Sequence, residues 1–110
     1  MKYTIIIKYS FLPAWFALSR ADRQGIERDV LAPLLAEFKD TVSMKMYDAE
    51  AFHADFSDFA VLNVSCLKSY GFFIDKLKDS ILFSQQYMQF VELFTGVESS
   101  YKQFDKEYQV

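Results

Sequence analysis

Two neighbouring segments of the chain, residues 41–47 and 59–64, carry the strand patterns that constrain its fold most. In the first segment Val42, Met44 and Met46 alternate with more polar residues, which predicts a strand with one buried face. The second segment is apolar on both faces apart from one asparagine, as expected of a central strand. We therefore expect neighbouring strands of one sheet, joined by a connection longer than a tight hairpin needs.

The chain before these strands predicts a further strand and an apolar segment. Residues 3–9 are rich in β-branched side chains and predict a first strand, which should end before Pro13. Residues 11–18 are too apolar for a free loop. We expect them to lie against the sheet edge or a partner, with Trp15 anchored.

An amphipathic helix is predicted from Ser19 to about Asp40. Ser19 and Asp22 have the spacing of a capping box, in which a hydroxyl accepts a backbone N–H. Pro33 should kink this helix or split it in two. Its apolar stripe repeats every four residues: Ile26, Val30, Leu34 and Phe38.

The second half of the chain repeats the order of helix and strand. A helix capped by Ser65 is predicted to bury Leu67, Tyr70, Ile74 and Leu77. A last strand over residues 87–95 places Met88, Phe90 and Glu92 on one face. The tail suits one more helix pinned to the body through Tyr101, Phe104 and Tyr108.

The order strand, helix, strand, strand, helix, strand predicts a ferredoxin-like α+β fold, with four antiparallel strands and the helices on one face. The length of 110 residues fits one domain over residues 1–110. With 12 Phe, 7 Tyr and one Trp, a small domain struggles to bury its rings alone. We therefore expect the other sheet face to pack against a second copy, giving a homodimeric α+β barrel with a pocket in each half.

The charge, the apolar runs and the cysteine content of the chain exclude several classes of function. The net charge is −3, with Lys and Arg scattered, so we expect no nucleic-acid partner. No apolar run approaches the roughly 18 residues of a membrane span, and residues 1–8 lack the features of a signal peptide. The only cysteine cannot form an internal disulfide, so we expect a cytoplasmic protein.

The one histidine, His53, lies in the acidic connection between the two central strands. A carboxylate beside a histidine orients the ring and raises its basicity, as general-base catalysis requires. His53, oriented by Asp48 or Glu50, is therefore the candidate catalytic group. The alternative, which the sequence favours, is a solvated loop in which the acids cap turns and the histidine binds backbone.

The sequence also suggests three other kinds of site. Tyr9, Phe11, Trp15 and Tyr47 are candidates for lining a small-molecule pocket, and the alternative is ordinary interface core. The acidic stretch matches no ligand motif, so we expect no metal and no cofactor. Cys66 could pair with His53 as a nucleophile, but a small buried hydrophobe is the favoured role.

Two pieces of sequence carry a resemblance to a known family. Residues 9–20, with Phe-Leu-Pro-Ala-Trp and Leu-Ser-Arg, and residues 47–59, with Asp-Ala-Glu-Ala-Phe and Ser-Asp-Phe, resemble the darcynin family of small bacterial proteins. The family is essentially uncharacterised, so the resemblance implies no substrate, cofactor or catalytic residue. The layout is also similar to cofactor-independent monooxygenases and related dimeric α+β barrels, a likeness of fold that does not fix function.

Two hypotheses of function follow. The first is a cytoplasmic homodimer whose aromatic pocket binds a small organic molecule and transforms it in the manner of a cofactor-independent oxygenase or isomerase. The second is a non-catalytic interaction or ligand-sensing module, in which the acidic stretch is a structural crossover.

Overall fold

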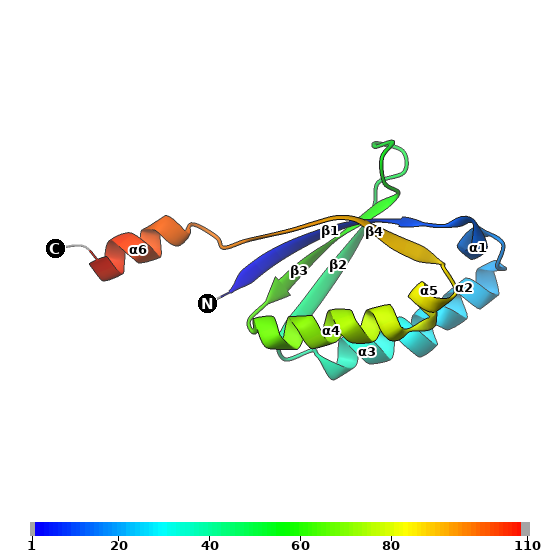
Figure 1. Cartoon of the computed structure of the whole chain (residues 1–110), viewed down its shortest axis with the longest axis horizontal. Coiled ribbons are helices and arrows are strands. Elements are labelled where there is room, and N and C mark those ends of the chain that lie inside the picture. Colours follow the sequence, from blue (N-terminus) through cyan, green and yellow to red (C-terminus); the bar gives the residue numbers. More distant parts are fainter. Residues whose placement is uncertain (1, 109–110) are drawn as a thin grey trace.

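The computed structural model describes residues 2–108, and its four strands form one antiparallel sheet (Figure 1). The strands are β1 (Tyr3–Phe11), β2 (Val42–Asp48), β3 (Asp58–Val64) and β4 (Met88–Gly96). Their order across the sheet is β2-β3-β1-β4, and each neighbouring pair is antiparallel. The two strands with the clearest sequence patterns, β2 and β3, are neighbours as predicted.

Helices cover one face of this sheet (Figure 1). The first helical region of this layer consists of α2 (Arg20–Ile26), the π-helix η1 (Glu27–Leu31) and α3 (Ala32–Glu37). Helix α4 (Leu67–Asp79) lies beside it. Short helices α1 (Pro13–Phe16) and α5 (Ile81–Ser84) lie at one end of the sheet, and α6 (Ser100–Tyr108) lies beyond the other end. The predicted ferredoxin-like α+β fold is confirmed.

The core lies between the sheet and the helices because alternate strand residues point to that side. Ile5 and Ile7 of β1 and Leu62 of β3 are at most 3% exposed, and Phe73 of α4 meets them from the helix side with 0% exposure. Fully burying a side chain of this size stabilises the fold by roughly 1.5–3 kcal/mol. Trp15 is buried at the end of this core, as predicted.

The first helical region begins and changes geometry where the sequence indicates. The Ser19 Oγ accepts a hydrogen bond from the Asp22 N–H at 3.0 Å, which confirms the predicted cap. The Ala32 N–H donates to the Glu27 carbonyl five residues earlier, as in a π-helix. This wider turn directly precedes Pro33, whose ring removes a donor and crowds the carbonyl four residues before it. The helical run from Arg20 to Glu37 is continuous, so Pro33 does not split it in two, and the π-helix is the irregularity that precedes the proline.

Two details of the second half were predicted wrongly. Cys66, not Ser65, is the N-cap of α4, because the Ser65 N–H donates to the Thr41 carbonyl at 3.0 Å and so prolongs the sheet. The buried face of α4 follows Phe73, Ile74 and Leu77, while the first turn with Leu67 stays in solvent.

A bulge in β4 also overturns the predicted alternation of that strand. Lys8 pairs with Glu92 and Tyr9 with Phe90, so Val91 is an extra residue in the ladder. Glu92 therefore shares the outer sheet face with Lys8, and the Lys8 Nζ lies 3.5 Å from the Glu92 Oε1. Before the bulge the even-numbered residues of β4 face the helices, and after it they face the outer side of the sheet.

The predicted last helix exists, but its predicted position is wrong. Tyr101, Phe104 and Tyr108 of α6 are 60–70% exposed, so α6 is not pinned to the body of its own chain. Across residues 2–108, no helix combines the length and the apolar character needed to cross a bilayer.

Candidate functional site

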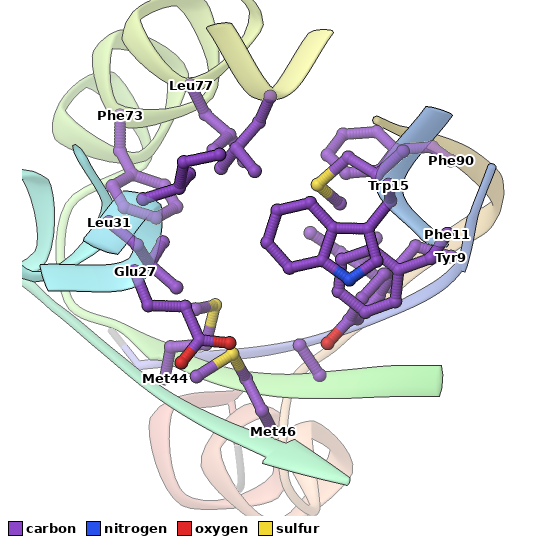
Figure 2. Close-up of a pocket in the computed structure, with 15 residues that line it drawn as sticks. Tyr9, Phe11, Trp15, Glu27, Leu31, Met44, Met46, Phe73, Leu77 and Phe90 are labelled. Carbon is purple, nitrogen blue, oxygen red and sulfur yellow. The ribbon is translucent and has the colours of Figure 1, made fainter. Parts of the chain in front are cut away.

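A pocket of about 60 Å³ lies between the sheet and the helices, at the end of the core that α1 closes (Figure 2). The inner face of the sheet forms its floor, and residues of α1, α2, η1, α4 and α5 form its walls. Its lining consists of one acid and fourteen apolar or aromatic residues: Ile7, Tyr9, Phe11, Trp15, Ile26, Glu27, Leu31, Met44, Met46, Ala60, Phe73, Leu77, Leu82, Met88 and Phe90.

Aromatic contacts fix one wall of this pocket. The Trp15 indole is 4% exposed and stacks on Phe11, with ring centroids 4.8 Å apart and planes at 15°. Its edge contacts Tyr87 at 5.7 Å, and Tyr9 meets Phe11 edge to face at the same separation. The Leu12 N–H donates to the Tyr87 carbonyl at 2.8 Å, which ties the start of α1 to the chain just before β4. Trp15 is thus held rigidly, with its other side toward the cavity (Figure 2).

Three methionines make the rest of the pocket adaptable. Met44 and Met46 come from the inner face of β2, and Met88 comes from the start of β4. Met46 is 52% exposed, so it lies at an open edge of the pocket. Unbranched thioether side chains change shape at little cost, and they suit a binding surface that must adjust to its occupant.

Glu27 and Tyr9 supply the oxygen atoms of the lining, and the Trp15 indole supplies an N–H. Figure 2 shows the Glu27 carboxylate and the Tyr9 hydroxyl both directed to the part of the cavity where Met46 lies. Burial raises the pKa of the Tyr9 phenol, and the charges of Asp58, Asp48 and Glu27 raise it further. Tyr9 therefore stays protonated at neutral pH and can donate a hydrogen bond to an occupant.

A pair of carboxylates lies beside Tyr9 on the same sheet face. Asp58 pairs with Tyr9 in the β1–β3 ladder and with Asp48 in the β2–β3 ladder. Asp58 is 6% exposed, and its Oδ1 has no hydrogen-bond partner among the described residues. Burial and the charges of Asp48 and Glu50 raise the pKa of Asp58, while a hydrogen bond from Ser57 lowers it.

The predicted catalytic residues do not meet the pocket. His53 and Glu50 lie on an exposed loop between β2 and β3, which rises on the side of the sheet opposite the helices (Figure 1). The His53 Nδ1 accepts the Asp55 N–H at 3.3 Å, and the His53 ring lies 4.4 Å from that of Phe56. Asp48 ends β2 next to this loop. These contacts match the structural interpretation of the acidic stretch, and catalysis by His53 stays a prediction.

Of the four predicted pocket residues, the structure brings three together. Tyr9, Phe11 and Trp15 line the cavity. Tyr47 does not, because it alternates to the outer sheet face and stacks on Phe59 there, with centroids 4.8 Å apart.

The other candidate chemistry is not assembled within residues 2–108. No three His, Cys, Asp or Glu side chains in this range converge as a metal site would require. Cys66 caps α4 at one end of β3, while His53 lies on the loop at the other end, so they form no nucleophile pair. Hydrogen bonds from Ser69 lower the pKa of the half-buried Cys66 thiol.

Glu27 is the one charged residue of the lining, and sequence reasoning missed it. Its charge places it off the apolar stripe, yet it lies four residues before Leu31 and seven before Leu34. Those spacings put it on the face of the helix that meets the sheet. A carboxylate at such a position is the signal that could have found it.

Structural comparisons give the same fold in proteins of low sequence identity. A chlorite dismutase from Candidatus Nitrospira defluvii, in complex with imidazole, superposes with a TM-score of 0.75 at 14% identity, over 87% of this chain and 39% of that one. A heme-binding protein from Thermus thermophilus gives a TM-score of 0.78 at 13% identity, over 93% of this chain and 43% of that one. This chain thus spans less than half the length of these structural neighbours.

Sequence comparisons give a family. Residues 2–109 match the family described as darcynin, a domain of unknown function. Darcynin 1 of Acinetobacter baumannii is 33% identical over 89 residues, which cover 81% of this chain and 98% of that protein. Darcynin of Chromobacterium violaceum is 32% identical over 77 residues, covering 70% of this chain and 96% of that protein. The chain therefore belongs to the darcynin family.

Proposed function

We infer that this darcynin is a homodimeric, cytoplasmic protein that binds a compact, mostly apolar organic molecule in the pocket between sheet and helices. The observation that carries this inference is the lining itself, in which a rigid Trp15 wall faces flexible methionines over an apolar floor. Apolar pockets with few convergent polar groups are the usual form of a small-molecule site. The ligand-binding descriptions of two structural neighbours agree with it.

The size of the pocket limits its occupant. Sites for drug-sized ligands enclose roughly 300–1,000 Å³, and an apolar cavity of roughly 150 Å³ takes a benzene molecule. The pocket measures about 60 Å³, so a single aromatic ring enters only if the methionines rearrange. Met46 is exposed enough to move aside.

The heme named for the Thermus protein does not fit this lining. Heme iron is held in proteins by His, Cys, Met with His, or Tyr. None of the lining residues is His or Cys, and His53 lies on the outer loop. Tyr9 is the remaining ligand type, but its raised pKa opposes the phenolate that would bind iron. The small volume opposes so large a group as well.

Charge narrows the class of ligand. Glu27 is the only charged residue of the lining. Asp58 is the ladder partner of Tyr9, and Asp48 is the ladder partner of Asp58. An anionic ligand would meet like charge on this side, whereas an ammonium group would meet a carboxylate and aromatic faces. We therefore expect neutral and cationic molecules to bind in preference to anions.

The test uses three probes with one phenyl ring each: 2-phenylethanol, 2-phenylethylamine and 3-phenylpropionate. Trp15 is the only tryptophan, so its fluorescence reports on the pocket directly. We expect the alcohol and the amine, but not the carboxylate, to change Trp15 emission and raise the melting temperature. Glu27→Gln should weaken the amine at least fivefold and leave the alcohol unchanged.

A filled pocket provides the matched control. Ala60 lies at the pocket floor with 2% exposure, so Ala60→Leu should occupy the cavity and abolish binding. Ala54→Leu makes the same change on the exposed loop and should bind as the parent does. The proposal fails if no probe affects the parent, or if Ala60→Leu binds all probes as well as the parent.

Proton transfer is the catalysis that this site could support, as in an isomerase or a cofactor-independent oxygenase. Glu27 is a carboxylate that can accept a proton, and Tyr9 is a phenol that can donate a hydrogen bond to a developing oxyanion. In an enzyme, Glu27→Gln should abolish turnover of a bound substrate while Tyr9→Phe lowers it. His53→Ala is the matched comparison, and a loss of turnover in that variant would return the proton transfer to His53.

A further inference from the structure

Helix α6 extends away from the body that precedes it. Figure 1 shows β4 running past the end of the helix layer, with α6 beyond it. The molecule measures 61 × 32 × 18 Å, and its radius of gyration of 16.3 Å exceeds the roughly 13 Å of a compact domain of this size. An arm that folded back on its own sheet would not give this shape.

The arm carries an apolar stripe that no other part of residues 2–108 buries. Tyr101, Phe104 and Tyr108 are spaced by three and four residues, so they share one face of α6. They are 63%, 60% and 70% exposed, and Phe104 stacks on Tyr108 with centroids 4.9 Å apart. An isolated helix of nine residues is marginal in water, so α6 needs a surface that buries this stripe.

The same chain presents a surface of matching character. The outer face of the sheet is covered by no helix of residues 2–108 (Figure 1). Ile6 pairs with Val61 on one side and with Phe94 on the other, so these three side chains form an apolar row across the sheet. Phe94 is 45% exposed, and the Tyr47–Phe59 stack continues the apolar surface on the same face.

We propose that α6 of each chain docks its Tyr101–Phe104–Tyr108 stripe on the outer sheet face of a second copy of the chain. One chain carries both the arm and the surface, as a two-fold, self-complementary interface requires. A buried ring contributes roughly 150–250 Å², so the exposed parts of three rings supply roughly 300–400 Å² per arm. Two arms and the surfaces they cover then bury about 1,200–1,600 Å², which lies within the roughly 1,200–2,000 Å² of standard-size specific interfaces.

This inference rests on the homodimer of the proposed function, and it adds the contact that builds it. Because the outer face lies on the opposite side of the sheet from the pocket, the interface and the ligand site can be disturbed separately. The two ideas are therefore tested by different measurements on the same variants.

Native mass spectrometry and light scattering on the full chain provide the test. We expect twice the 12.9 kDa chain mass for the parent and a monomer for Phe104→Asp. Gln103→Asp adds the same charge on the polar side of α6 and should stay dimeric. Val61→Arg, on the receiving face, should also give a monomer. Trp15 emission and probe binding should match the parent in every variant, which shows that the body remains folded.

Mixing the two monomeric variants makes the test specific for exchange between chains. The Phe104→Asp chain has a damaged arm and an intact face, and the Val61→Arg chain has the reverse. Only their mixed dimer contains one intact contact, so the mixture should regain dimer at micromolar concentration while each variant alone does not. A Phe104→Asp protein that remains dimeric overturns the arm contact but keeps the homodimer. A monomeric parent overturns both, while probe binding to Trp15 decides the ligand site independently.

Discussion

Replacing Asp58 with asparagine should make the protein more stable at neutral pH. Asp58 is 6% exposed, its Oδ1 lacks a hydrogen-bond partner in the described part of the chain, and Asp48 lies opposite it in the β2–β3 ladder. Burial, together with the charges of Asp48 and Glu50, raises the pKa of the Asp58 carboxyl. At pH 7 the folded protein therefore holds a buried carboxylate in an unfavourable place.

The direction of the pH dependence follows from this raised pKa. The folded state holds the Asp58 proton more tightly than the unfolded chain does. The resulting stabilisation is complete below the ordinary aspartate pKa of about 3.9 and is lost as the pH rises through the higher folded value. Asp58→Asn removes the charge, and its amide can donate to Asp48. Since a buried unsatisfied polar group costs roughly 1–3 kcal/mol, we expect a gain of about 1 kcal/mol at pH 7 and a much smaller gain at pH 4.

Urea unfolding followed by Trp15 fluorescence, repeated from pH 4 to pH 8, measures this difference. Asp55→Asn changes an exposed acid on the neighbouring loop and controls for the loss of one negative charge. A lower free energy of unfolding for Asp58→Asn at pH 7 would refute the reasoning. So would a gain of the same size at every pH, because the titration of Asp58 would then play no part.

Three further substitutions test separate contacts. Ser19→Ala removes the hydroxyl that caps α2 and should lower the free energy of unfolding by about 1 kcal/mol in urea titrations. Trp15→Ala leaves a cavity in the aromatic wall and should cost about 3–5 kcal/mol, measured by circular dichroism because the fluorophore is lost. The Lys76 Nζ lies 2.7 Å from the Glu37 Oε1 in an exposed ion pair. Lys76→Ala breaks this pair and should lower the free energy of unfolding by less than about 1 kcal/mol, and by less still in 1 M salt.

The sequence was sufficient for the fold because each strand and helix pattern agreed with its neighbours. Alternation in β2 predicted a strand with one buried face, and continuous apolar character in β3 predicted a central strand. The sheet order places β3 between β2 and β1, as a central strand requires. The cap at Ser19 and the change of helix geometry before Pro33 were local signals that tertiary contacts left in place. Such signals act within a few residues, so one sequence can reveal them.

The errors came from features that depend on contacts across the chain. The bulge at Val91 arises from the pairing of β4 with β1, and nothing in β4 alone marks it. Tyr47 was assigned to the pocket by residue type, although the alternation of β2 already placed it on the outer face. Glu27 was left out of the predicted apolar stripe because it is charged, although its spacing placed it toward the sheet. In both cases position was a better guide than chemistry.

Successive residues of a strand point to opposite faces of the sheet, so the proposed ligand site and the proposed dimer interface lie on different faces. Ile7 and Tyr9 of β1 point to the pocket, while Ile6 and Lys8 between them point to the outer face. In β4 the bulge at Val91 shifts this alternation, so that Phe90 reaches the pocket and Phe94 joins the outer apolar row. Substitutions on opposite faces share few contacts, so their effects on ligand binding and on dimerisation should add with little interaction. A double variant, Glu27→Gln with Phe104→Asp, should therefore be a monomer with the same weakened amine binding as Glu27→Gln alone.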